Sequence, residues 1–258
     1  RKESSAASDV YKRQGIDIGS TASKVAIMDD DKKEILYTKL LPSGWNSRET
    51  GEEIKKWIES LNLGDVGIVA TGYGRISVPY ADKTVTEITC HAKGALFLNP
   101  KDMTVIDIGG QDTKVIVVED DMVSDFLMND KCSAGTGKFL EVMANRLGLT
   151  LHEMFEFAKK GEPVPISSVC TVFAESEIIS LMGKGTPRED IACGVVQSIV
   201  KKVAALSSKR LKSGDVFLTG GFCDSDYVIG ELSKELGATV HTDPRARFAG
   251  AIGAALLA

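Results

Sequence analysis

Two segments of the sequence place an aspartate, a glycine turn and a lysine in the same order. Ile16–Val25 and Ile106–Val115 are identical at six of ten positions, and the second begins 90 residues after the first. A glycine in a turn lets backbone N–H groups approach an anion without a Cβ in the way. The equivalent carboxylates, Asp17 and Asp107, suit a hydrated Mg²⁺ that bridges polyphosphate oxygens. The repeat therefore indicates nucleotide phosphate chemistry.

Other residues near these turns extend the candidate phosphate site. Hydroxyl groups and a lysine follow the first turn, and Gln111 with Asp112 in the second can position an attacking water. A third glycine turn, Gly220-Gly221, follows the apolar segment 216–219. We take Asp17, Asp107 and Gln111 as candidate catalytic residues. The predicted nucleotide contacts of the three turns are Gly19, Ser20, Thr21, Ala22, Ser23, Lys24, Gly109, Gly110, Gln111, Asp112, Gly220 and Gly221.

The alternative interpretation of these turns is purely structural. A single Asp-x-Gly turn is most often no more than a hairpin. Two copies and a third turn, each after an apolar strand, make a coincidence a much weaker explanation. The sequence contains no Gly-Lys-Ser/Thr of a P-loop, so a nucleotide site here is of another kind.

The turns need strands on either side of them. Each copy predicts a strand–turn–strand hairpin, and their spacing indicates two related halves with a cleft between them. Strands then alternate with helices, which predicts an α/β fold with mixed sheets. Residues 1–14 lack periodicity and are set aside as a non-native or disordered leader. The halves are expected at 15–100 and 101–258, with the terminal helix able to pack back on the first. Helices are predicted near 47–61, 87–98, 137–147, 152–160, 174–182, 188–211 and 246–257.

The glycine turns also resemble motifs of a known superfamily. Gly15-Ile-Asp-Ile-Gly-Ser-Thr, Ile106-Asp-Ile-Gly-Gly-Gln-Asp and Leu218-Thr-Gly-Gly resemble the phosphate-1, phosphate-2 and adenosine motifs of actin/Hsp70/sugar-kinase ATPases. From Gly15 onward the sequence is similar to the BadF/BadG/BcrA/BcrD family, the activators of 2-hydroxyacyl-CoA dehydratases and their benzoyl-CoA reductase relatives. The resemblance implies two ribonuclease-H-like domains with ATP and Mg²⁺ in the cleft between them. Arg247 falls where that family carries a glutamine near the nucleotide.

Two of the five cysteines lie in unusual contexts. Cys132 and Cys170 each precede a predicted helix, whose N-terminus stabilises a thiolate or an anionic iron–sulfur cluster. A [4Fe-4S] cluster usually has four thiolates, so two per chain suffice if a homodimer shares it. The resemblance implies that arrangement. The alternatives are four cysteines of one chain or a Zn²⁺ site, and the lack of a C-x-x-C pair disfavours zinc. Cys90 and Cys193 are interpreted as buried packing residues, and Cys223 is left open.

The resemblance implies an ATP-dependent electron donor. Its reduced cluster would pass one electron to a 2-hydroxyacyl-CoA dehydratase or benzoyl-CoA reductase-type partner, driven by ATP hydrolysis, with ferredoxin or flavodoxin as electron source. One rival hypothesis is a small-metabolite kinase of the same superfamily, such as an N-acetylhexosamine kinase, which needs a sugar pocket and no cluster. Another is a nucleotide-responsive scaffold that has lost turnover.

Composition disfavours several other classes of protein. The 258 residues are 43% hydrophobic and 26% charged, as in ordinary soluble proteins, and the net charge of −5 argues against nucleic acid or an anionic membrane surface. No apolar run reaches the roughly 18 residues of a membrane span. Few, scattered cysteines fit a reducing compartment, so we expect a cytoplasmic protein. His91, His152 and His241 show no metal-ligand spacing and are interpreted as structural or surface residues.

Overall fold

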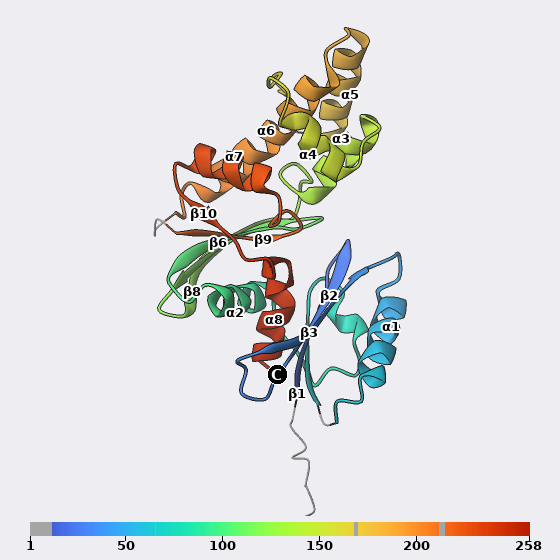
Figure 1. The fold of residues 1–258 in the computed structure, drawn as a ribbon, viewed down its shortest axis with the longest axis vertical. Helices are drawn as coiled ribbons and strands as arrows, with labels where there is room; N and C mark the ends of the chain where they lie inside the picture. The colour runs from blue at the N-terminus through green and yellow to red at the C-terminus, as the bar shows by residue number, and fades with distance from the viewer. Residues whose placement is uncertain (1–11, 65, 168–169, 212–214) are drawn as a thin grey trace, which may run out of the picture. The chain divides into compact units, whose positions relative to one another are not determined.

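The structure is a computed structural model that describes residues 12–64, 66–167, 170–211 and 215–258. The chain divides into two compact units, and Figure 1 labels most of their elements. The first unit comprises the chain up to Phe97 together with Phe248–Ala258, and the second is Leu98–Arg247. The C-terminal segment thus belongs to the first unit, and each unit has its own five-stranded sheet.

The first unit is built on a mixed sheet. Its strands lie in the order β3-β2-β1-β4-β5, and β1 pairs antiparallel with β2 and parallel with β4. Helix α2 ends one residue beyond the boundary between the units. The elements are β1 (Lys12–Ile18), β2 (Ala22–Met28), β3 (Ile35–Pro42), α1 (Ser47–Ser60), β4 (Val66–Thr71), η1 (Arg75–Ser77), β5 (Lys83–Thr84), α2 (Glu87–Leu98) and α8 (Ala249–Leu256).

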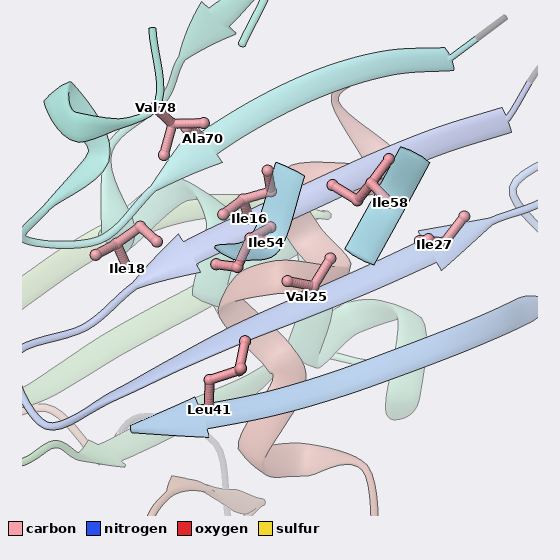
Figure 2. Packing of buried hydrophobic residues seen from close by; sticks show 9 residues of the cluster. All are labelled: Ile16, Ile18, Val25, Ile27, Leu41, Ile54, Ile58, Ala70 and Val78. Atoms are coloured by element: carbon pink, nitrogen blue, oxygen red, sulfur yellow. The ribbon is translucent and has the colours of Figure 1, made fainter. Parts of the chain in front are cut away.

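Alternation along β1 sends its side chains to two different environments. Ile16 and Ile18 lie in the hydrophobic core that α1 completes with Ile54 and Ile58 (Figure 2). Asp17, between the two isoleucines, faces α8, which packs against β1, β2 and β4. The pattern of one strand therefore buries two isoleucines and turns the candidate catalytic carboxylate toward the C-terminal helix.

Glycines allow α8 to lie unusually close to its neighbours. A Cβ on Gly15 of β1 would stand 1.8 Å from the Ala251 carbonyl oxygen, and one on Gly253 would stand 1.8 Å from the Cys90 carbonyl oxygen. Any larger residue at either position would clash with backbone. The close fit of α8 between β1 and α2 is therefore set by glycine on both sides.

The second unit has the same sheet plan with more helices. Its strands lie in the order β10-β9-β6-β7-β8; β6 pairs antiparallel with β7 and parallel with β9. Helix α6 packs against β7 and against α3, α4, α5 and α7. The elements are β6 (Met103–Ile108), β7 (Thr113–Glu119), β8 (Met122–Asn129), α3 (Gly137–Arg146), α4 (Leu151–Ala158), α5 (Thr171–Gly183), α6 (Arg188–Ser207), β9 (Val216–Gly220), α7 (Asp226–Leu236), β10 (Val240–His241) and η2 (Ala246–Phe248).

The predicted α/β class with mixed sheets flanked by helices is confirmed. Both predicted hairpins form, as β1/β2 and β6/β7, and helix α2 spans the predicted residues 87–98. Within the described residues, no helix is long and apolar enough to cross a membrane.

The first sheet differs from expectation at β1 and β3, and the short β5 was not predicted either. β1 begins at Lys12, so residues 12–14, which we had set aside as leader, are paired strand residues. The rest of the supposed leader, residues 1–11, lies outside the described residues. β3 was not predicted, because Leu41 is its only buried residue and the apolar alternation is correspondingly weak.

Candidate functional site

Asp17 lies near the end of β1 in an almost closed environment. It is 4% exposed, and Lys24 Nζ is 3.6 Å from its Oδ2. The sheet register pairs Asp17 with Lys24 on β2 and with Thr71 on β4. Its Oδ1 lies against Gly72, where a Cβ would stand 2.5 Å away. The carboxylate is thus buried beside one cation at the base of the first glycine hairpin.

Asp107 holds the equivalent place in the second unit, with stronger contacts. The register pairs it with Lys114 and Thr219. Thr219 Oγ1 donates to Asp107 Oδ1 at 3.0 Å, and Lys114 Nζ lies 3.4 Å from Oδ2. The same ammonium is 2.8 Å from Asp112 Oδ1, and it is 3% exposed. One buried cation therefore holds both carboxylates of the second hairpin.

In each unit the strand that pairs parallel with the aspartate strand leads into Thr-Gly, and the two glycines adopt the same conformation. Gly72 and Gly220 have φ of 90° and 89°. A Cβ would stand 2.5 Å from the Ile18 carbonyl oxygen at Gly72, and 2.3 Å from that of Ile108 at Gly220. Only glycine is compatible with this backbone and this approach.

Sequence reasoning missed three residues of this arrangement, namely Thr71, Gly72 and Thr219. The signal was present in the sequence. The same dipeptide follows an apolar strand in both halves, at 71–72 and 219–220. The dipeptide extends the repeat beyond the two hairpins to the strand that pairs parallel with each aspartate strand.

The structure separates the predicted phosphate contacts by exposure. Ser20, Thr21 and Gln111 are exposed and available to a ligand. Ser23 is fully buried, and its Oγ is 2.8 Å from Ser43 Oγ, which donates to the Gly19 carbonyl at 2.5 Å. Contrary to expectation, the Ser23 hydroxyl therefore braces the hairpin from within. The partly exposed members of the set are Gly19, Ala22, Lys24, Gly109, Gly110 and Asp112.

The third glycine turn leaves open space beside it. A Cβ on Gly221 would have no atom within 4 Å, and the residue is exposed. Arg247 forms an ion pair with Asp224, three residues beyond the turn. The Arg247 guanidinium is thus tied to a carboxylate near the predicted adenosine contact.

The cysteines fall into two groups. Cys90, Cys193 and Cys223 are buried, and burial raises the pKa of each thiol, that of Cys90 to about 12. Cys132 and Cys170 are exposed. The interpretation of Cys90 and Cys193 as packing residues is confirmed, and Cys223 joins them.

The two exposed cysteines lie on loops that are joined. Ser133 Oγ and Thr171 Oγ1, on the residues that follow the two cysteines, are 2.6 Å apart. Cys170 is the N-cap of α5, and Cys132 lies shortly before α3. Within the described residues, no group of three or more His, Cys, Asp or Glu is arranged to hold a metal ion.

Hydrogen bonds also connect the second glycine hairpin to the Cys132 loop. The N–H groups of the first two residues of α3 donate to the carbonyls of Gly109 and Gly110, both at 2.8 Å. Thr113 Oγ1 donates to the Gly135 carbonyl at 2.6 Å. The hairpin tip, the start of α3 and the Cys132 loop are thus one hydrogen-bonded segment of the second unit.

One known family matches a stretch of the chain that includes both hairpins and both Thr-Gly strand ends. Residues 14–258 match the BadF/BadG/BcrA/BcrD ATPase family. The chain belongs to this family. It is therefore an ATPase, as the resemblance implied.

Relatives in the BadF/BadG/BcrA/BcrD ATPase family match along nearly the whole chain. The (R)-2-hydroxyglutaryl-CoA dehydratase activating ATPase of Acidaminococcus fermentans is 45% identical over 95% of each chain. The activator of lactoyl-CoA dehydratase of Anaerotignum propionicum is 43% identical over 95% of this chain and 96% of its own.

Solved structures also match the chain along nearly its whole length. The Acidaminococcus fermentans (R)-2-hydroxyglutaryl-CoA dehydratase component A superposes with a TM-score of 0.90, covering 96% of this chain and 97% of its own. The Clostridium difficile activator of 2-hydroxyisocaproyl-CoA dehydratase, with bound ADPNP, is 36% identical with a TM-score of 0.88, covering 96% and 94%. A Streptomyces griseus ROK family glucokinase, 17% identical with a TM-score of 0.63, shares the fold alone.

Proposed function

We propose that the chain is an ATP-dependent activator that delivers an electron to a 2-hydroxyacyl-CoA dehydratase or a benzoyl-CoA reductase-type partner. The observation that carries this proposal is the hydrogen-bonded continuity of the second unit. The Gly109-Gly110 hairpin bonds to the start of α3, and the Cys132 loop bonds in turn to the Cys170 loop through Ser133 and Thr171. An event at the phosphates has a direct physical route to both cysteines.

In this proposal, the glycine hairpins of the two units bind the nucleotide phosphates. The exposed hydroxyls of Ser20 and Thr21 and nearby backbone N–H groups bind the phosphates, and Gln111 orients the attacking water. Asp17 and Asp107, buried at the bases of the hairpins, hold hydrated Mg²⁺. Their burial beside lysines keeps both carboxylates fixed and ready for a second cation. The adenosine lies against Gly220-Gly221, where the open space at Gly221 leaves room for it.

In this proposal, Cys132 and Cys170 are the ligands of an iron–sulfur cluster. Two exposed thiols on joined loops, each before a helix N-terminus, fit half of a [4Fe-4S] ligand set. When bound, the cluster supplies the electron that leaves the protein. A second copy of the chain supplies the other two thiolates, so the active form is a homodimer.

The surface next to Cys170 supports a homodimer. Val172 and Phe173, in the first turn of α5, are 66% and 67% exposed. Large apolar side chains of this kind on a monomer surface mark a site that another protein covers. We infer further that the protein is cytoplasmic and that ferredoxin or flavodoxin reduces it.

The proposal is tested by activation of a dehydratase under anaerobic conditions. The reduced protein is mixed with (R)-2-hydroxyglutaryl-CoA dehydratase, the enzyme named for the 45% identical relative. We expect dehydratase activity with ATP but not with ADPNP, and none with Cys132→Ser. The matched control is Cys193→Ser, which removes a buried thiol and should leave activation intact. Activation without ATP, or by the Cys132→Ser variant, would contradict the proposal.

A further inference from the structure

The carboxylate of Asp107 is held from both neighbouring strands. Thr219 Oγ1, on β9, donates to Asp107 Oδ1 at 3.0 Å, and Lys114 Nζ, on β7, lies 3.4 Å from Oδ2. Of these two contacts, the one with Thr219 has the ordinary length of a hydrogen bond. Lys114 Nζ lies closer to Asp112 Oδ1, at 2.8 Å, so its charge is shared between two carboxylates. Thr219 therefore gives Asp107 a contact that is directed at one oxygen atom.

The surroundings of Thr219 suit a side chain that fixes a direction. Thr219 is fully buried, and Asp107 is almost fully buried. A β-branched side chain has few rotamers, so the strand decides where the hydroxyl of a buried threonine points. A hydrogen bond to an ionised carboxylate is also stronger than a bond between neutral groups. The Thr219 hydroxyl is therefore able to hold the carboxylate in one orientation.

Strand register alone does not produce this bond. Thr71 of β4 pairs with Asp17 in the first unit as Thr219 of β9 pairs with Asp107 in the second. Within the part of the chain that the structure describes, the Thr71 hydroxyl makes no hydrogen bond to Asp17. The bond between Thr219 and Asp107 is thus a feature of the second unit and no general consequence of the repeat.

Thr219 also comes directly before the predicted adenosine turn. The Gly221 N–H donates to the carbonyl of Ile108, the residue after Asp107, at 3.2 Å. The end of β9 is therefore bonded to the end of β6 twice, by the side chain of residue 219 and by the backbone of residue 221. The carboxylate and the adenosine turn are adjacent parts of one hydrogen-bonded strand pair.

We propose that Thr219 is a positioning residue for Asp107, whose carboxylate its hydroxyl directs toward the hydrated Mg²⁺ of the bound nucleotide. The inference rests on the proposed role of Asp107 and gives a task to a residue outside the predicted contact set. Groups that hydrogen bond to a metal-binding carboxylate orient it, and their loss typically lowers metal affinity or activity by about 10- to 100-fold. A bond that served only the fold would leave the Mg²⁺ dependence of nucleotide binding unchanged.

The experiment compares Thr219→Val, which removes the hydroxyl at nearly constant volume, with Thr219→Ser, which keeps a hydroxyl. The matched control is Thr104→Val. Thr104 is a fully buried residue of β6 that pairs with Val216 of β9 and donates through Oγ1 to the Arg210 carbonyl at 3.1 Å. This control removes a buried hydroxyl from the same strand pair without touching the bond to Asp107.

Three quantities are measured on the full chain: the thermal midpoint, the kcat for ATP hydrolysis, and the affinity for ADPNP with Mg²⁺ and with EDTA. The last two are measured well below the thermal midpoint of every variant, so that differences in stability do not enter. We expect Thr219→Val to lower kcat by about 10- to 100-fold. Its ADPNP affinity should fall in Mg²⁺ but not in EDTA. Thr219→Ser should recover most of both, and Thr104→Val should match the wild type.

Two results would overturn the inference and leave the role of Asp107 intact. One is a wild-type kcat and a wild-type Mg²⁺ dependence of ADPNP binding in Thr219→Val, while Asp107→Asn is inactive. The other is an equal loss of ADPNP affinity in Mg²⁺ and in EDTA, with no recovery in Thr219→Ser. Full ATPase activity in Asp107→Asn would instead refute the proposed role of Asp107 itself. If Thr219→Val does not fold, Thr219→Cys carries the test, because a thiol is only a weak hydrogen-bond donor.

Discussion

Lys114 is a buried cation between two carboxylates of the second hairpin, and Lys114→Met is the substitution whose cost the structure defines best. The ammonium lies 3.4 Å from Asp107 Oδ2 and 2.8 Å from Asp112 Oδ1, and its side chain is 3% exposed. Methionine keeps the volume of the lysine stem but removes the charge. Asp107 would then remain buried as an anion without this cation.

Removal of one partner from a buried ion pair costs about 3–5 kcal/mol. We therefore expect Lys114→Met to lower the free energy of unfolding by about that amount. The matched control is Lys24→Met, which removes the equivalent cation of the first unit. Lys24 is 21% exposed and 3.6 Å from Asp17, so water partly screens this pair and the loss should be smaller than that of Lys114→Met.

Urea unfolding measures both effects, with a different signal for each unit. Trp45 and Trp57 are the only tryptophans of the sequence and both belong to the first unit, so their fluorescence follows Lys24→Met. Far-UV circular dichroism follows Lys114→Met. In an Asp112→Asn background, where one carboxylate is already neutral, Lys114→Met should cost less. The reasoning would be refuted if Lys114→Met cost no more free energy of unfolding than Lys24→Met. It would also be refuted if Lys114→Met cost the same with and without Asp112→Asn.

Three further predictions follow from single residues. Gln14 is fully buried and its amide has no hydrogen-bond partner among the described residues, so Gln14→Leu should raise the free energy of unfolding by about 1–3 kcal/mol. Gln197→Leu, which removes an amide that donates to Glu231, should not; equal gains would contradict the argument. Buried thiols with a raised pKa stay protonated at pH 8 and the thiolate is the reactive form, so iodoacetamide should modify Cys132 and Cys170 in the native, cluster-free protein. Cys90, Cys193 and Cys223 should react only after unfolding, as mass spectrometry of the peptides would show. Gly221→Ala should melt as the wild type does but bind ADPNP more weakly, whereas Gly220→Ala, at φ 89° and with a Cβ 2.3 Å from a carbonyl oxygen, should lose stability; unchanged binding in Gly221→Ala would place the nucleotide elsewhere.

Local patterns in the sequence predicted the local parts of the structure. The Asp-Gly-Lys hairpins form because each turn and its two strands are neighbours in the sequence. Helix α2 matches its predicted span because its pattern ends just before Pro100. The polar Lys12 and Arg13 gave no strand signal, yet both pair with β4, and Arg13 also pairs with β2, which draws them into the sheet.

The rest of the candidate site depends on contacts between distant residues. Thr71 and Thr219 reach the two aspartates only through parallel pairing of strands. The Ser23 hydroxyl is held by a hydrogen bond with Ser43, the residue that follows β3 in the sequence. Asp17 lies against α8 because Gly15 and Gly253 let that helix approach β1 and α2. None of these contacts has a spacing that a single sequence reveals.

In the proposed function, Cys132 and Cys170 hold half of a cluster shared by two chains. The most direct test is anaerobic reconstitution, followed by iron and acid-labile sulfide analysis and by measurement of the native mass. We predict a dimer with about two iron and two sulfide per chain, since four of each are shared by two chains. Either Cys132→Ser or Cys170→Ser should lose both, and Cys193→Ser should keep both. A full iron and sulfide content in the Cys132→Ser variant, or in a monomeric protein, would contradict the account.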